Sequence, residues 1–236
     1  MGGNHGTLHR SPNGSDRPRR PDSRAGSAGR KRTGGDSGIA GDDHGRDPGP
    51  APADRGDSKP YYVVTDFGAV GDGATDNTSA FQAAYAAAAG QPLYIPPGTY
   101  KHSGLNLHGP GRLYGAGRHL SVLTGGSIGI QLRSPGITLE SFAQRGSGFC
   151  GVYGNQTLSD IALRQMAVTD CGEFGLRLQN DGGSWAVDGL VVEDSEFLRF
   201  AGTYGYGTHG IYVKSAKNVT LRNVDAGHCA VGAGGQ

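Results

Sequence analysis

The chain has 236 residues, a formal net charge of +1 and 18% charged residues. This balance argues against nucleic acid as a partner, because nucleic-acid-binding domains carry a marked excess of basic residues. No stretch approaches the roughly 18 consecutive apolar residues that a membrane span needs, so we expect no membrane partner.

Residues 1–58 differ in composition from the rest of the chain. They contain no Val, Phe, Tyr, Trp or Cys, and Gly, Arg, Asp, Ser and Pro fill most of the segment. Such a segment buries too little apolar surface to offset its conformational entropy. It also has no apolar core of a recognisable signal peptide. We therefore predict a disordered tail over 1–58 and one folded domain over 59–236.

The first part of this domain, "VVTDFGAVGDGATD" (63–76), resembles a ligand-binding loop in composition. Its first half is typical of a strand, and "GDGATD" (71–76) is typical of a turn. The glycines lack the order of a nucleotide-binding loop, and the acidic residues lack the spacing of a calcium loop. We predict no metal site and no cofactor here; calcium is compatible with the chain but not indicated by it.

A short helix is predicted next. Asp76 is expected to cap its first turn, and Gly90 stands where a glycine commonly ends a helix. The segment "LYIPPGTY" (93–100) then returns to extended chain. One apolar stripe at helical spacing supports the helix: Phe81, Ala84, Tyr85 and Ala88.

Four later segments line up without gaps and begin 24, 29 and 29 residues apart. Each alternates apolar and polar residues, as a half-buried strand does, and then reaches a polar turn residue. The segments are "ITLESF" (137–142), "IALRQM" (161–166), "LVVEDS" (190–195) and "VTLRNV" (219–224), and their turn residues are Ser141, Gln165, Asp194 and Asn223.

A second column of strands begins with glycine each time: "GIQL" (129–132), "GVYG" (151–154), "GLRL" (175–178) and "GIYV" (210–213). Units this thin cannot bury their own apolar faces, so they must stack around a shared core. A doubly wound α/β fold would need helices between the strands, and no helical pattern follows residue 90. The predicted fold class is all-β: a right-handed parallel β-helix with a short N-terminal capping α-helix. The end of the chain, "CAVGAGGQ", looks like the opening of another coil, so we expect the domain to be truncated there.

The stretch "VTDFGAVGDGATDNTSAFQAA", followed by "LYIPPGTY", resembles the N-terminal signature of the pectate lyase superfamily. Relatives of glycoside hydrolase family 28, mannuronan C5-epimerases and phage tailspike depolymerases share this β-helix. The resemblance implies an extracellular or virion-associated protein that acts on or binds a polysaccharide. It identifies the fold more firmly than the reaction, because these relatives differ in chemistry.

Outward-facing residues of the second column would form ladders along the solenoid. In "GLRL" the two leucines are expected to face the core, which turns Arg177 outward. Aromatic and cationic or amide side chains together suit a uronate-bearing sugar chain, although exposed strand residues without a function give the same pattern. The first ladder is Gln131, Tyr153, Arg177 and Tyr212, and the second is Arg133, Asn155, Gln179 and Lys214.

Candidate catalytic residues lie at one end of this column. "THGIYV" (208–213) resembles a Gly-His-Gly-Ile stretch of family 28 hydrolases, which makes His209 a candidate acid or base. Tyr206 lies near it, as a tyrosine does in the epimerases. Glu173 falls where the hydrolases carry an aspartate pair, but Cys150 replaces a further aspartate. Glycoside hydrolysis normally uses a pair of carboxylates, and this set contains only one, Glu173. Proton abstraction beside a uronate carboxylate is therefore the favoured chemistry.

The sequence therefore predicts a protein that binds an acidic polysaccharide and cleaves or modifies it by lyase-type β-elimination or related chemistry. Its candidate ligand contacts are Tyr153, Arg177, Tyr212, Lys214 and Gln179. The alternatives are a tailspike-like module, which would be a homotrimer, and a structural β-helix without activity. The three cysteines, Cys150, Cys171 and Cys229, are interpreted as buried free thiols, since they show no metal-ligand spacing.

Overall fold

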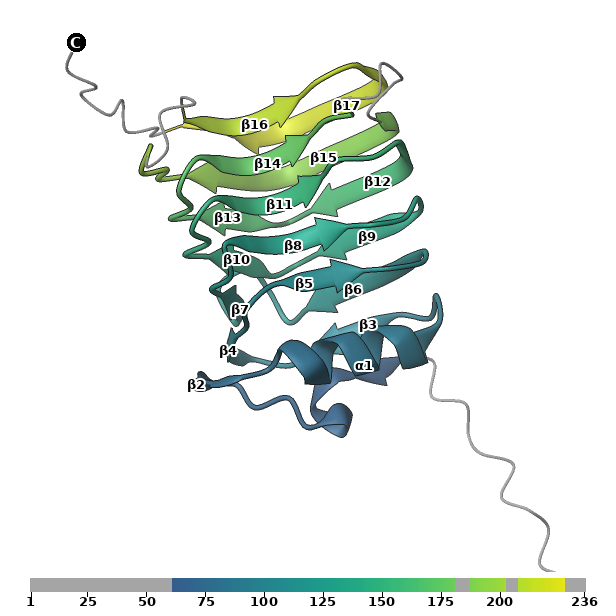
Figure 1. Cartoon of the computed structure of the whole chain (residues 1–236), viewed down its shortest axis with the longest axis vertical. Helices are drawn as coiled ribbons and strands as arrows, with labels where there is room; N and C mark the ends of the chain where they lie inside the picture. Colours follow the sequence, from purple (N-terminus) through teal and green to yellow (C-terminus); the bar gives the residue numbers. More distant parts are fainter. Residues whose placement is uncertain (1–60, 181–186, 203–207, 228–236) are drawn as a thin grey trace, which may run out of the picture. The chain divides into compact units, whose positions relative to one another are not determined.

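The computed structural model describes residues 61–180, 187–202 and 208–227. These residues wind into stacked coils, and the strands of successive coils pair in parallel throughout (Figure 1). The predicted parallel β-helix is confirmed. Within the described residues, no helix is long and apolar enough to cross a membrane.

Two sheets make up the coils, one of 12 strands and one of five. The larger sheet follows the order β1 (Tyr62–Val63), β3 (Leu93–Ile95), β6 (Gly111–Gly115), β9 (Ile137–Glu140), β12 (Leu158–Arg164), β15 (Val187–Leu198), β13 (Ala167–Thr169), β10 (Ala143–Arg145), β7 (Ser121–Thr124), β4 (Gly98–Lys101) and β2 (Asp72–Asp76), with β17 (Ala216–Asp225) paired to β15. The smaller sheet follows the order β16 (His209–Val213), β14 (Phe174–Leu178), β11 (Cys150–Gly154), β8 (Ile128–Leu132) and β5 (Leu105–Leu107).

A coil thus has three walls, for example β9, β10 and β11. The long strand β15 runs through the first two walls without a break, since residues 187–193 pair with β12 and residues 196–198 pair with β13. The larger sheet therefore bends around a corner at Asp194, and the smaller sheet closes the third side.

Apolar side chains of equivalent positions stack along the inside of the first wall. The ladder register aligns them one above another, and each buried aliphatic side chain contributes about 1.5–3 kcal/mol. The last member of the stack among the described residues is Leu221, which is 54% exposed. Its buried members are Leu93, Leu113, Leu139, Leu163 and Val192.

The corner between the first two walls is made by the four turn residues expected from the repeat. Ser141, Gln165, Asp194 and Asn223 have φ angles of 58°, 51°, 49° and 49°. This left-handed conformation costs an ordinary side chain about 1–2 kcal/mol, and it turns the chain at the same point in these four coils. The prediction of a turn in this column is confirmed.

The glycines that open the smaller sheet's strands allow close packing against the opposite walls. A Cβ added to Gly175 would lie 2.5 Å from the carbonyl oxygen of Gly210 and 2.8 Å from the rings of Phe197 and Phe200. Only glycine fits between these groups, so the position faces the interior.

The N-terminal elements differ in part from the prediction. Residues 62–67 form β1 and a 3-10 helix, η1 (Val64–Phe67), rather than one strand. Residues 72–76 form strand β2 rather than a plain turn, because they pair with β4 across an irregular register. The Asp72 carboxylate still makes a local turn by accepting the N–H groups of Ala74 and Thr75, each at 2.8 Å.

The predicted helix is present as α1 (Thr78–Ala88) at the N-terminal end of the stack (Figure 1). Its predicted apolar stripe is buried and joins the core. Asn77, not Asp76, is the N-cap residue, although the Asp76 carboxylate accepts the Thr78 N–H at 2.8 Å. At the other end, Ala89 and Gly90 both have positive φ. That the helix stabilises the first coil as a cap stays a prediction.

Candidate functional site

The outer face of the five-stranded sheet carries the first predicted ladder in register. Gln131 pairs with Tyr153, Tyr153 with Arg177, and Arg177 with Tyr212. Asn106 of β5 extends the column by one rung. Each rung lies about 4.8 Å from the next, the spacing of paired strands. The sequence repeat therefore predicted this row of side chains correctly.

Arg177 lies at the centre of an aromatic cluster on this face. Its guanidinium carbon is 4.5 Å from the ring centroid of Phe174, 5.4 Å from that of Phe149 and 5.7 Å from that of Tyr212. Its Nε donates to Oε1 of Gln179 at 3.0 Å. The three rings and Gln179 thus hold the Arg177 guanidinium in one orientation. These contacts restrict the rotamers of the side chain and leave part of it at the surface.

Phe174 is the ring that the sequence patterns did not identify. It is 3% exposed but lies outside the core cluster, because it is covered by Arg177 and its aromatic neighbours. Gly175 and Leu176 both face the interior, so the alternation slips by one residue and Phe174 turns outward. One signal in the sequence could have identified Phe174: it directly precedes Gly175, just as His209 directly precedes Gly210 in β16.

His209 packs on this cluster. Its ring stacks on Phe174 with centroids 5.5 Å apart and planes at 10°, and it meets Tyr212 edge-on at 5.6 Å. Its backbone N–H donates to the carbonyl of Glu173 at 3.0 Å. His209 and Arg177 therefore contact the same two rings, those of Phe174 and Tyr212. Tyr206, the second candidate acid or base, lies outside the described residues.

The Glu173 side chain is fully buried, with 0% exposure. A carboxyl group in this position does not contact a polymer on the outer face directly. Any part that Glu173 plays in the site acts through a neighbouring residue.

The second predicted ladder lies beside the first and is linked to it by side-chain hydrogen bonds. Arg133 donates to Oδ1 of Asn106 at 3.4 Å and to Oδ1 of Asn155 at 3.5 Å. Nε2 of Gln179 donates to the hydroxyl of Tyr153 at 3.4 Å. Lys214 follows β16 and is exposed. The two ladders form one polar and aromatic surface.

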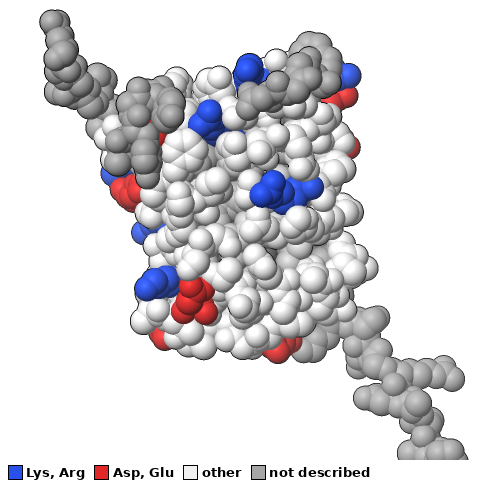
Figure 2. Space-filling model, in the orientation of Figure 1, with Lys and Arg blue, Asp and Glu red and all other residues white. Residues whose placement is uncertain are grey.

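This surface is positive. The strands of the five-stranded sheet contain no Asp or Glu, while Arg177 lies on β14, and Arg133 and Lys214 directly follow β8 and β16. Figure 2 shows separate groups of Lys and Arg on the upper half of this side of the molecule, and Asp and Glu on its lower part and along its edges. The charge favours a ligand that carries carboxylates.

The thiols of the described residues are buried in the protein. Cys150 and Cys171 are buried and free, as predicted, and Cys229 lies outside the described residues. Burial raises the pKa of the Cys150 thiol well above its usual range and that of Cys171 to about 11, so neither is an activated nucleophile. No group of three or more His, Cys, Asp or Glu side chains in the described part of the chain is arranged to hold a metal ion.

Comparison with known proteins agrees with this architecture. Residues 61–132 match the family described as rhamnogalacturonase A/epimerase, pectate lyase-like. No curated protein matches the chain. Among solved structures, PfbA, a surface adhesin of Streptococcus pneumoniae, is similar at a TM-score of 0.57 with 17% identity, over 70% of this chain and 49% of that one.

Two enzymes are similar at lower TM-scores. The catalytic unit of the GH87 alpha-1,3-glucanase of Streptomyces thermodiastaticus strain HF3-3 gives a TM-score of 0.46 and 27% identity, over 70% of this chain and 30% of that one. The A-module of the mannuronan C-5 epimerase AlgE6 of Azotobacter vinelandii gives 0.41 and 20%, over 69% of each chain. The chain thus spans less than half the length of the glucanase unit and of PfbA. Residues 61–132 are thus similar in sequence to the pectate lyase-like family, and the described residues share the parallel β-solenoid fold of PfbA.

Proposed function

We propose that this protein binds an acidic polysaccharide along the outer face of its five-stranded sheet and removes the proton beside a uronate carboxylate. The observation that carries the proposal is Arg177, held over three aromatic rings on a face whose strands contain no Asp or Glu. A fixed guanidinium pairs well with a carboxylate, and the flat rings beside it offer surfaces for sugar rings.

The chemistry assigns a role to each group on the face. Arg177 would neutralise the uronate carboxylate, which lowers the cost of forming a carbanion beside it. His209 would take the proton, because its ring stacks on Phe174, the same ring that Arg177 covers. Arg133, Gln179 and Lys214 would contact neighbouring sugar units. Tyr206 is retained as the expected proton donor to the leaving oxygen.

Hydrolysis fits this face less well than β-elimination or C5 epimerisation. A glycoside hydrolase normally places two carboxyl groups on either side of the scissile bond. The five strands supply none, and Glu173 is buried. Proton abstraction needs a base and a cation instead, and His209 and Arg177 are such a pair.

Binding without cleavage is the second candidate function. It is supported by the likeness in fold to PfbA, whose name describes a surface adhesin. A protein of this kind would be extracellular or virion-associated, and a tailspike-like form would be a homotrimer. Its mass in solution, measured by light scattering, separates the trimer from the monomer.

The decisive experiment offers the full chain pectate, alginate and hyaluronan. The absorbance of unsaturated uronate reports elimination, NMR of the recovered polymer reports epimerisation, and titration calorimetry reports binding. We expect His209→Ala to abolish turnover while the variant still binds polymer. Arg177→Ala should weaken binding, whereas Arg112→Ala, at an arginine that lies 4.7 Å over the ring of Tyr114 on the other sheet, should leave both unchanged. Binding without product would select the adhesin-like function, and an absence of binding to all three polymers would overturn the proposal.

A further inference from the structure

The corner between the first two walls is built differently in one coil. Two residues connect β9 to β10 and β12 to β13, but five residues, 116–120, connect β6 to β7. Hydrogen bonds fix this longer loop, because the N–H of Gly117 donates to the carbonyl of Ser141 and the N–H of Leu120 donates to the carbonyl of Gly117, each at 2.9 Å. The loop therefore has a fixed position beside the row of turn residues Ser141, Gln165 and Asp194.

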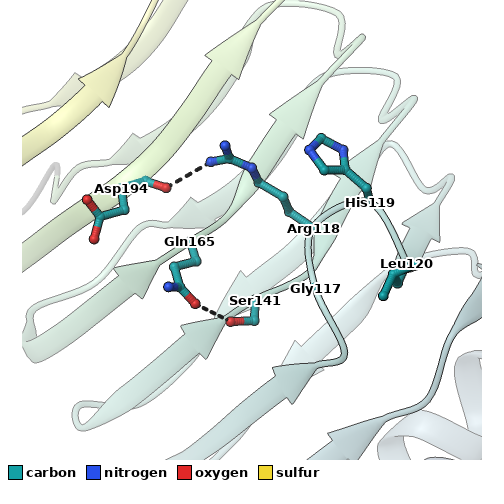
Figure 3. Close-up of a pocket in the computed structure, with 7 residues that line it drawn as sticks. All are labelled: Gly117, Arg118, His119, Leu120, Ser141, Gln165 and Asp194. Carbon is teal, nitrogen blue, oxygen red and sulfur yellow. Dashed lines mark hydrogen bonds between the residues drawn. The ribbon is translucent and has the colours of Figure 1, made fainter.

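Arg118 extends from this loop along the column. Its Nη1 donates to the backbone carbonyl of Asp194 at 3.0 Å, a contact between residues 76 apart in the sequence. To reach that carbonyl the side chain passes alongside Ser141 and Gln165 (Figure 3). The guanidinium is held by a neutral carbonyl, so its charge is not cancelled by an ion pair with a described residue.

A groove of about 390 Å³ lies between the loop and the column. This volume falls in the range of small-molecule sites, which is roughly 300–1,000 Å³. Its lining consists of Gly117, Arg118, His119, Leu120, Ser141, Gln165 and Asp194 (Figure 3).

The hydrogen bonds along the column are interrupted at this groove. The Ser141 hydroxyl donates to Oε1 of Gln165 at 2.6 Å, and Nδ2 of Asn223 donates to Oδ1 of Asp194 at 2.9 Å. No hydrogen bond among the described residues joins Gln165 to Asp194. Within the same residues, nothing pairs with Nε2 of Gln165, Oδ2 of Asp194 or Nη2 of Arg118, so donors and an acceptor remain available around the groove.

The charges of the lining select the class of ligand. Asp194 disfavours an anion and Arg118 disfavours a cation, so the groove suits a neutral ligand that both accepts and donates hydrogen bonds. Sugar hydroxyl groups do both. Leu120, which is 56% exposed, adds an apolar surface for the C–H groups of a sugar ring.

We propose that this corner groove is a second carbohydrate site, which binds a neutral sugar unit through Arg118, Gln165 and Asp194. It lies at the corner of the larger sheet, whereas the aromatic surface lies on the smaller sheet. The ligand class also differs, because the aromatic surface is positive and carries no carboxylate on its strands. The proposal therefore stands independently of the function assigned to the aromatic surface.

The test is titration calorimetry of the full chain with neutral oligosaccharides of glucose, galactose and mannose, and with oligogalacturonate as the acidic counterpart. We expect at least one neutral oligosaccharide to bind. Arg118→Ala and Asp194→Asn should each weaken that binding by about tenfold or more, the effect of losing one charge-assisted hydrogen bond. Asparagine is chosen because it tolerates the positive φ of residue 194.

The opposite corner supplies matched controls. Asp170 also has positive φ, at 59°, and accepts from Nε of Arg199 at 2.6 Å. Asp170→Asn and Arg199→Ala should leave neutral-sugar binding unchanged, and so should Arg177→Ala on the aromatic surface. The proposal is overturned if no neutral oligosaccharide binds, if the Arg118 and Asp194 variants bind as well as the unmodified chain, or if oligogalacturonate is the ligand whose binding depends on Arg118.

Discussion

The guanidinium carbon of Arg177 lies 4.5 Å from the ring centroid of Phe174, and the ring of His209 stacks on the same phenyl group with centroids 5.5 Å apart. One buried aromatic side chain thus aligns the cation and the imidazole that the proposed chemistry needs. The arrangement depends on the planarity of the guanidinium, which can both stack on a ring and donate in its own plane.

Arg177→Lys tests this dependence. Lysine keeps the charge but loses the planar stack and the directed bond to Gln179, so binding of an acidic polymer should weaken by about two- to fivefold, the range of an exposed cation–π contact. The matched variant Arg112→Lys loses a comparable stack on Tyr114 and should bind normally. Equal affinity in calorimetry for both variants would contradict the role given to the stack.

The helix α1 is expected to stabilise the first coil through Phe81. This side chain is 2% exposed and meets the ring of Tyr100 edge-on at 5.6 Å. Phe81→Ala should lower the free energy of unfolding by about 3–5 kcal/mol, while Gln82→Ala on the exposed side of the same helix should change it little. Chemical denaturation measures both. A loss below about 1 kcal/mol for Phe81→Ala would show that the helix does not act as a cap.

The end of α1 offers a stabilising change. Ala89 has a φ of 46°, a left-handed conformation that is unfavourable for alanine and ordinary for glycine. Ala89→Gly should therefore raise the free energy of unfolding by about 0.5–1 kcal/mol. The same substitution at Ala83, inside the helix and exposed, should lower it by about 1 kcal/mol. Thermal melting compares the pair, and changes of equal sign would contradict the assigned backbone conformation.

His102 should make stability depend on pH. It is 2% exposed, its Nδ1 accepts the N–H of Gly104 at 3.1 Å, and its Nε2 pairs with Oε1 of Gln144 at 3.0 Å. Burial lowers the pKa of His102 below its ordinary 6.5, although the charge of Asp76 opposes the shift. The unfolded chain then binds the proton more readily, so this contribution to stability is complete above pH 6.5 and falls as the pH drops below that value.

The slope from this one proton should reach at most about 1.4 kcal/mol per pH unit. Urea titrations between pH 7.5 and roughly 5 measure it. His102→Gln should flatten the dependence, whereas His108→Gln at an exposed histidine should not. A slope that persists in the His102 variant would assign the effect to other groups.

The parts of the fold that repeat could be predicted from the sequence. Ser141, Gln165, Asp194 and Asn223 recur at one place in each of four units. Stacked strands keep the same face inward, so the sequence alone predicts a common turn at these residues. The outward ladder through Arg177 followed from the same alternation.

The missed features lie where the repeat is broken. Phe174 turns outward because two consecutive residues, Gly175 and Leu176, face the core, and no alternating pattern records that slip. The loop at 116–120 occurs once, so comparing the units with one another could not show that Arg118 reaches Asp194. The sequence predicts a turn where strand β2 lies, because the pairing of β2 with β4 is irregular and leaves no alternating pattern.

Because the strands pair in parallel and in register, the outward side chains of the aromatic surface form a straight row with equal steps. Each coil from β5 to β16 adds one rung, about 4.8 Å from the last, to the same outward row. Under the proposed function, the number of coils would set how many units of a polymer the protein spans, and the side chain on each rung would set what is recognised there. Lengthening the row by a whole coil would extend the reach along a polymer without altering the rungs already present.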